Sequence, residues 1–148
     1  MSESEEKDVL FMREALKEAQ VAWNRDEVPI GAVVVCNDRI IARAHNLTEA
    51  LNDATAHAEM QALTAAANSI GGKYLDQCCL YVTVEPCPMC AAAMYWTHLG
   101  RIVYGAADEK RGYMRISDKL LHPRTIVKGN VLKEECASLI VNFFKRKR

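Results

Sequence analysis

The strongest constraint on the fold of this chain is a pair of short motifs that lie far apart in the sequence. The first reads His57-Ala58-Glu59 and the second reads Pro86-Cys87-Pro88-Met89-Cys90. Catalytic zinc sites use three protein ligands and leave the fourth position to water, whereas structural sites close the tetrahedron with four. Because His57, Cys87 and Cys90 supply three ligands, we expect a fold that brings both motifs to one metal ion.

Glu59 is the remaining polar side chain of the first motif, and it need not be a ligand. If His57 faces the metal from the first turn of a helix, the nearby carboxylate reaches the zinc-bound water without coordinating the ion. Glu59 is then a proton shuttle, which takes a proton from the water and delivers protons to a ring nitrogen and a leaving amine. The motif pair therefore predicts a catalytic zinc site with Glu59 as its catalytic residue.

Secondary structure patterns place both motifs at helix starts. Thr55–Ala67 is rich in helix formers, and Asp53 or Thr55 is available as its N-cap, which would put the first motif in the first turn. Cys79–Val84 has the β-branched and aromatic composition of a buried strand, and Pro88–His98 follows it as a helix. The positive end of each helix dipole would favour the thiolate form of both cysteines.

The remaining pattern alternates strands and helices, which predicts an α/β fold with helices on both faces of a sheet. The other expected elements are a helix over Asp8–Asn24, strands over Ala32–Cys36 and Arg39–Ala44 joined by an Asn37-Asp38 turn, strands over Arg101–Ala106 and Ile126–Lys128, and a final helix. With 148 residues, half of them hydrophobic, the chain has enough apolar material for one core. One domain over residues 1–148 is therefore expected.

Composition also limits the compartment and the cysteine chemistry. The sequence begins with polar and acidic residues and contains no run of about 18 apolar residues, so we expect a cytoplasmic protein without a membrane partner. Six cysteines in a chain of this size fit a metal site better than a disulfide framework. The cysteines outside the second motif are expected to be reduced: Cys36, Cys78, Cys79 and Cys136.

The charge distribution leaves two interpretations of the carboxy-terminal segment open. A net charge of zero argues against an extended, sequence-blind nucleic-acid binder, and DNA is not an expected partner. The last residues, Lys145–Arg148, are all basic and follow Phe143 and Phe144. They could grip a single-stranded RNA loop, with Phe144 as a substrate-binding residue. Equally, they could be the solvated end of a helix whose apolar stripe includes Phe143.

Several segments around the two motifs carry a resemblance to a known family. They are Val28–Val33, His45-Asn46, Asp53–Glu59, Leu80–Cys87, Arg101–Ala106, and Gly129–Ala137 with Phe143-Phe144. In these segments the chain resembles the cytidine deaminase-like zinc superfamily, and most closely its bacterial tRNA-specific adenosine deaminases. The resemblance implies a three-layer domain with a mixed five-stranded sheet, one zinc ion per subunit and a homodimer. It also implies conversion of adenosine to inosine at the wobble position of a tRNA anticodon stem-loop.

The same resemblance implies the substrate contacts. Asn46 would hydrogen-bond the target base, Pro29 and Ile30 would line the pocket, and Asp108 and Lys110 would touch RNA beside the target nucleotide. Each of these residues also has an ordinary structural interpretation. Asn46 could be a turn residue, Pro29-Ile30 the start of a strand, and Asp108 and Lys110 part of a solvated charged loop.

Two alternative functions remain at this stage. The second motif followed by Ala93-Met94-Tyr95-Trp96 resembles bacterial guanine deaminases, and the loop Glu109–Lys119 departs from the tRNA enzymes, whereas Val131–Arg148 resembles the tRNA enzymes. A non-catalytic, zinc-stabilised binding subunit would need a fourth ligand such as Glu59 or His45, which the H-x-E spacing does not favour. The tRNA enzyme remains the preferred hypothesis.

Overall fold

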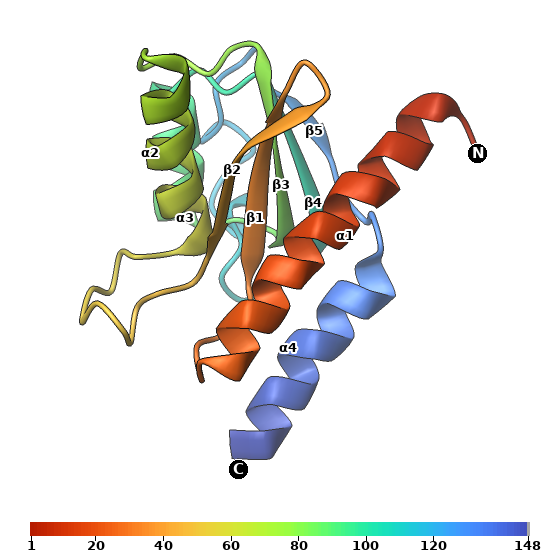
Figure 1. The fold of residues 1–148 in the computed structure, drawn as a ribbon, viewed down its shortest axis with the longest axis vertical. Helices are drawn as coiled ribbons and strands as arrows, with labels where there is room; N and C mark the ends of the chain where they lie inside the picture. The colour runs from red at the N-terminus through yellow and green to blue at the C-terminus, as the bar shows by residue number, and fades with distance from the viewer. Residues whose placement is uncertain (148) are drawn as a thin grey trace.

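The computed structural model describes residues 1–147, so Arg148 of the predicted basic segment lies outside the described residues. The chain forms three layers (Figure 1). A sheet with strand order β2-β1-β3-β4-β5 lies between helices α1 and α4 on one face and α2 and α3 on the other. The predicted three-layer α/β architecture is confirmed.

Strand directions make the sheet mixed, as predicted. Strand β1 runs antiparallel to β2 and β3, whereas β3, β4 and β5 are parallel to one another. The strands are β1 (Gly31–Cys36), β2 (Arg39–His45), β3 (Cys78–Val84), β4 (Arg101–Ala106) and β5 (Ile126–Lys128). The helices are α1 (Glu3–Asn24), α2 (Ala58–Ile70), α3 (Pro88–Trp96) and α4 (Lys133–Lys147), with a short 3₁₀ turn η1 (Tyr113–Arg115).

The central strands bury both of their faces. In β1, Ala32 and Val34 pack into the cluster under α2 and α3, while Val33 and Val35 pack into the cluster under α1. Successive side chains of a strand point to opposite faces, so an unbroken apolar run such as this one feeds both layers. This is why the central strands lack the alternation of polar and apolar residues that marks a half-exposed sheet.

Helix α1 crosses the sheet at a glycine. A Cβ atom on Gly31 would overlap the backbone of Ala15 and Ala19, two fully buried residues of α1. Small residues on both sides therefore let the helix lie directly on the start of β1. Replacing Gly31 by a larger residue would push the helix off the sheet.

Three helix boundaries that differ from the sequence-based expectation have a clear local reason. Helix α1 begins at Glu3 and not at Asp8, because Ser2 and Glu5 form a capping box in which the Glu5 amide donates to Ser2 Oγ at 3.1 Å. Helix α2 begins at Ala58, because the Asp53 carboxylate accepts a hydrogen bond from the Thr55 amide at 2.8 Å and does not cap the helix. Helix α3 ends at Trp96, two residues early, because His98 adopts a left-handed φ of 53°.

One edge of the sheet collects the segments that carry the sequence motifs. Gly31 at the start of β1 pairs with His45 at the end of β2, and Val84 at the end of β3 pairs with Ala106 at the end of β4. The segment that precedes β1 and the segments that follow β2, β3 and β4 therefore converge there.

In the part of the chain that the structure covers, no helix has the length and apolar character needed to cross a membrane.

Candidate active site

The two motifs meet at the starts of two helices. His57 is the N-cap residue of α2 and Cys87 is the N-cap residue of α3, with Cys90 in the first turn behind it. The Nδ1 atom of His57 lies 3.6 Å from Cys87 Sγ and 3.5 Å from Cys90 Sγ. All three donor atoms lie within 4.8 Å of one another.

The spacing of these donors fits a zinc ion. Zinc binds cysteine sulfur at about 2.3 Å and histidine nitrogen at about 2.0 Å, so tetrahedral S and N ligands lie about 3.5 Å apart. The two S···N distances in the chain, 3.6 and 3.5 Å, match this value. Among residues 1–147 the group contains His57, Cys87 and Cys90 and no fourth donor, which is the ligand number of a catalytic zinc site.

The two cysteines differ in their acidity. The hydrogen bond from the Cys90 thiol lowers the pKa of Cys87 to about 4 against the opposing effect of burial, and the Cys90 amide and the His57 ring also favour the thiolate. The hydrogen bond to Cys87, together with burial, raises the pKa of Cys90. These shifts favour the thiolate at Cys87 and oppose it at Cys90, whereas the sequence predicted it at both. A cation in contact with both sulfurs is needed to make Cys90 a thiolate as well.

Two buried side-chain oxygens next to the donor group lack hydrogen bonds. Glu59 Oε1, in the first turn of α2, and Asn46 Oδ1, just after β2, find no partner among the described residues 1–147. We call them the open oxygens. Burial raises the pKa of Glu59 to about 7. A buried polar atom without a partner is costly, and in native proteins it commonly indicates a bound ligand, water or a catalytic role.

Both open oxygens belong to residues that line one pocket of about 260 Å³. Its walls come from the segments that converge at the sheet edge, from the start of α2 and from the last turns of α4. The lining residues are Val28, Ile30, Asn46, Thr48, His57, Ala58, Glu59, Val84, Glu85, Cys87, Asp108, Arg111, Ile140 and Phe144. The pocket is mainly apolar with a few converging polar groups, as ligand sites usually are.

Most of the residues that the sequence singled out line this pocket, and three do not. Cys90 is fully buried behind the pocket, beside His57. Pro29 is also buried and does not line the pocket, whereas its neighbour Val28 does. Lys110 lines an adjoining pocket of about 530 Å³ instead, which shares Asp108 and Phe144 with the first.

Neighbouring residues of α4 have different surroundings. Phe143 is buried and packs edge-on against Trp23 at 5.5 Å between ring centroids, as the apolar stripe predicted. Phe144 is 40% exposed and lines the pocket. The last basic residues of the helix, Arg146 and Lys147, pair with Asp26 at 3.1 and 2.5 Å. Part of the basic segment therefore fixes α4 against the end of α1.

Among the pocket residues that were not singled out from the sequence, three show how much signal was available. Ile140 lies one helical turn before Phe144, so the i, i+4 spacing of the two could have indicated a shared face. Arg111 belongs to the charged loop after β4, where its neighbours Asp108 and Lys110 were singled out because of the resemblance. Thr48 offered no signal, since its place depends on how the loop after β2 folds.

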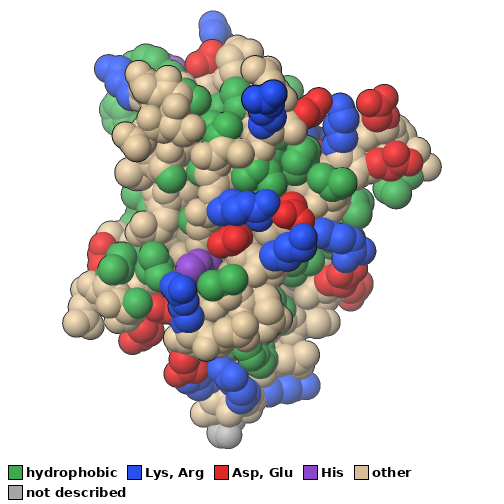
Figure 2. All heavy atoms as spheres, in the orientation of Figure 1, with side chains coloured by type: hydrophobic (Ala, Val, Ile, Leu, Met, Phe, Trp, Pro, Cys, Tyr) green, Lys and Arg blue, Asp and Glu red, His purple; other side chains and the backbone are tan. Residues whose placement is uncertain are grey.

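The outer surface shown in Figure 2 has no excess of one sign of charge. Figure 2 shows acidic and basic side chains interspersed over the visible face, in agreement with the zero net charge.

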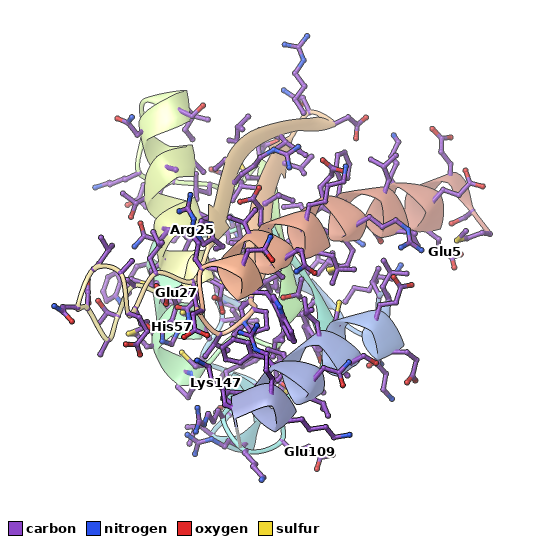
Figure 3. The ribbon with its side chains drawn as sticks, turned by 60° about the horizontal axis from the view of Figure 1, so that its bottom comes forward. Glu5, Arg25, Glu27, His57, Glu109 and Lys147 are labelled. Carbon is purple, nitrogen blue, oxygen red and sulfur yellow. The ribbon has the colours of Figure 1, made fainter. Side chains whose placement is uncertain are left out.

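In Figure 3, His57 and Glu27 lie at the same end of the molecule as Lys147, and Glu5 lies far from them. The last turn of α4 therefore ends close to the pocket.

Comparison with known proteins gives consistent results. The family model for the cytidine and deoxycytidylate deaminase zinc-binding region matches residues 5–106. A tRNA-specific adenosine deaminase of Bacillus subtilis (strain 168) is 45% identical over 147 residues, covering 95% of this chain and 91% of that protein. A solved structure from work on A-to-I editing by tRNA:A34 deaminases at the wobble position of transfer RNA has a TM-score of 0.81 and 42% identity. The match covers 87% of this chain and 97% of the chain in that structure.

The rival suggested by the sequence is also present among the similar structures. Guanine deaminase from Bacillus subtilis has a TM-score of 0.64 and 37% identity, over 72% of this chain and 66% of that chain. Both its coverage and its TM-score are lower than those of the tRNA:A34 deaminase structure. The fold is therefore shared with deaminases of other substrates, while relatives that are 38–45% identical over nearly the whole chain are named tRNA-specific adenosine deaminases.

Proposed function

Because this chain belongs to the cytidine and deoxycytidylate deaminase zinc-binding family, we propose that it hydrolyses adenosine to inosine and ammonia at the wobble position of a tRNA anticodon loop. The observation that carries the proposal is the donor group of His57, Cys87 and Cys90 next to the open oxygen of Glu59. The tRNA substrate is supported by the relatives that match nearly the whole chain.

In the proposed reaction, Glu59 moves the protons. The zinc ion held by His57, Cys87 and Cys90 supplies, when bound, a water that ionises near neutral pH. Glu59 lies beside the donor group and accepts a proton from this water through its open oxygen. It donates this proton to the ring nitrogen of the base. It then takes the proton of the hydroxyl group that has added to the base and passes it to the amine, which leaves as ammonia. A pKa raised to about 7 by burial suits a group that must both accept and release protons near neutral pH.

Other residues of the pocket would hold the base. The open oxygen of Asn46 accepts a hydrogen bond and its amide nitrogen donates one, so this side chain can read an edge of a purine. Ile30 and Ile140 supply apolar walls that exclude water. The partly exposed ring of Phe144 at the rim is available for stacking with a neighbouring base. An anticodon loop presents unpaired bases, so little pairing must be broken to reach this pocket.

The assembly and the compartment follow from the same proposal. We expect one zinc ion per subunit, a homodimer and a cytoplasmic location, where tRNA is found. The end of α3, where Trp96 is 75% exposed and Tyr95 39% exposed, offers an apolar surface for contact with a second copy. Light scattering of the purified protein at low micromolar concentration tests the dimer, and metal analysis of the same sample tests the zinc content.

The first experiment is to measure deamination by zinc-loaded protein on two substrates in parallel. One is an anticodon stem-loop RNA with adenosine at the wobble position, and the other is free guanine. We expect inosine in the RNA and no xanthine from guanine. A matched RNA with adenosine in the paired stem is the control and should stay unchanged.

The opposite results would identify the alternatives. Xanthine from guanine with an unchanged RNA would contradict the tRNA proposal and support the guanine deaminase. Binding of zinc and RNA without any product from either substrate would support the non-catalytic binding subunit.

A further inference from the structure

A buried glutamate that has no part in the proposed chemistry lies between a strand and the metal site. Glu85 follows Val84, the last residue of β3, and precedes the Pro86-Cys87 step into α3. It is 7% exposed, and its side chain reaches the loop that follows β4. Buried carboxylates are rare unless their oxygens are satisfied, so the partners of this one are informative.

The carboxylate of Glu85 clamps both ends of that loop. Its Oε1 atom accepts a hydrogen bond from the Asp108 amide at 3.1 Å, and its Oε2 atom accepts one from the Met114 amide at 3.1 Å. The adjoining backbone contributes as well. The Glu85 amide donates to Ala106 at 2.8 Å, and the Tyr113 amide donates to the Pro86 carbonyl at 2.9 Å. The side chain thus continues the pairing of β3 and β4 beyond the strand ends.

A glycine permits this close contact. A Cβ atom on Gly112 would overlap the carboxylate of Glu85 and the backbone oxygen of Asp108. The φ angle of Gly112 is −68°, which any residue adopts, so its backbone conformation does not require glycine. The loop therefore has glycine at this position because its backbone lies directly on Glu85 and on the Asp108 carbonyl.

The clamped loop carries side chains of the pocket wall. Asp108 and Arg111 line the pocket, and Lys110 lines the adjoining one. Within the loop, Asp108 Oδ1 accepts hydrogen bonds from the amides of Lys110 at 3.2 Å and Arg111 at 3.0 Å. The turn that presents these residues is thus rigid by itself. Its position relative to the metal ligand Cys87 depends on Glu85.

From these contacts we infer that Glu85 is a positioning residue, which holds the 108–114 loop at the pocket so that Lys110 and its neighbours meet the nucleotides beside the target base. This inference rests on the proposed function for the identity of the RNA. Glu85 acts on RNA recognition through the loop and not on the chemical step. Its loss should therefore raise KM for the RNA and leave kcat nearly unchanged.

The chain offers a matched control at the loop after β2, which contributes Thr48 to the pocket. Glu27 is also buried, at 1% exposure, and also accepts two amides, from Glu49 at 3.0 Å and Ala50 at 2.8 Å. It clamps the loop after β2, which does not carry Lys110. Glu27→Gln therefore changes the same chemistry at a different loop.

The test begins with Glu85→Gln, which keeps the size of the side chain but can accept from only one of the two amides. We expect unchanged zinc content and a KM for the anticodon stem-loop about tenfold higher. Leaving a buried amide without an acceptor destabilises the bound position of the loop by a free energy that corresponds to about this factor. We expect kcat within about threefold of the wild-type value. Loss of zinc, or a fall in kcat with KM unchanged, would overturn the inference.

A double-mutant cycle shows whether Glu85 acts through the loop. Lys110→Ala should raise KM in the wild-type background and have little further effect in the Glu85→Gln background, because the loop is already displaced. In the Glu27→Gln background, Lys110→Ala should keep its full effect. Additive effects of Glu85→Gln and Lys110→Ala would contradict the positioning role.

Hydrogen exchange provides a readout that does not depend on activity. In Glu85→Gln, the amides of Asp108 and Met114 should exchange faster, while those of Glu49 and Ala50 should not change. Glu27→Gln should give the reverse pattern. If wild-type protein fails to convert the RNA, the proposed function fails. The exchange pattern still decides whether Glu85 holds the loop, and unchanged exchange at both amides would reject it.

Discussion

Asp8 and Glu59 are two buried carboxylates with opposite surroundings. The Asp8 side chain, in α1, is 2% exposed and accepts hydrogen bonds from three side chains. These donors are Tyr81 Oη at 2.7 Å, Arg101 at 2.8 and 2.9 Å, and Lys128 at 2.9 Å. Glu59 is 3% exposed and keeps one open oxygen.

The acidity of the two groups reflects this difference. Burial by itself would raise the pKa of Asp8, but the hydrogen bonds from Arg101, Tyr81 and Lys128 outweigh it and hold that pKa well below its ordinary range. For Glu59 burial dominates and raises the pKa to about 7. Burial alone therefore does not define the role of a carboxylate. One with all partners supplied by the protein holds the fold together, and one with a partner missing is available for chemistry.

The largest expected effect is at Glu59. Glu59→Gln should lower kcat by about 10²–10⁴-fold, the usual contribution of a general acid–base group. The free energy of unfolding should not fall, because the substitution removes a buried ionisable group whose oxygen was open. Single-turnover kinetics, metal analysis and urea unfolding check the three parts. Loss of zinc together with activity would mean that Glu59 is a ligand, and the open-site hypothesis would fail.

The next effect should appear at Asp8, in stability and not in activity. Asp8→Asn should lower the free energy of unfolding by about 2–3 kcal/mol. Removing one partner of a buried ion pair lowers the free energy of unfolding by about 3–5 kcal/mol. The loss is smaller here because the cations also reach solvent. The activity per folded molecule should stay within about twofold, because Asp8 lies away from the pocket. Urea unfolding checks the first statement and kinetics the second.

A matched control for Asp8 is Asp38→Asn. Asp38 pairs with Lys7 at 3.1 Å on the surface, with its side chain 68% exposed, so its substitution should leave stability unchanged. Equal losses for the two variants would remove the contrast between buried and exposed pairs.

A smaller effect is expected at Asn46, which holds the other open oxygen. Asn46→Ala should lower kcat/KM for the anticodon stem-loop by about tenfold, which is the contribution of one or two hydrogen bonds to a base. Thermal stability should not change, since the lost oxygen has no partner within residues 1–147. Steady-state kinetics and a melting curve test this, and a fall in stability without a change in kcat/KM would show that Asn46 is only a turn residue.

The smallest effect is a pH dependence that separates the two carboxylates further. The pKa of Asp8 is lower in the folded protein, so its contribution to stability is complete above the unfolded-state pKa of about 3.9. That contribution is lost as the pH falls through the folded-state value. The stability difference between wild type and Asp8→Asn should therefore shrink below about pH 4. Urea unfolding at pH 7, 5 and 3 checks this, and a constant difference would contradict it.

The sequence predicted the metal site better than it predicted the surrounding polar network. Cys87 and Cys90 lie one helical turn apart at a helix start, so local spacing was enough to place them. Asp8 appeared only as the first residue of an expected helix, with no sign of its partners. Its partners Tyr81, Arg101 and Lys128 come from three different strands, and only the assembled sheet brings them to it.

The clamping glutamates were beyond sequence reasoning for a different reason. Glu85 and Glu27 bind backbone amides, which every residue other than proline provides, so no side-chain pattern marks their partners. The exact start of α2 was also missed, because the Asp53 carboxylate bonds within its own turn. His57 consequently occupies the N-cap itself. Competition between local hydrogen bonds decided this boundary, and helix propensity alone does not include it.

The two chain ends offer very different attachment points for engineering. Helix α4 lines the pocket through Ile140 and Phe144 near its end, whereas Ser4 near the start of α1 lies by the β1–β2 hairpin at the opposite edge (Figure 1). An affinity tag or fused domain placed after α4 would begin beside the opening through which a large RNA must approach. Attachment ahead of α1 leaves that approach free, so the amino terminus is the better site for a fusion partner or for immobilisation on a surface.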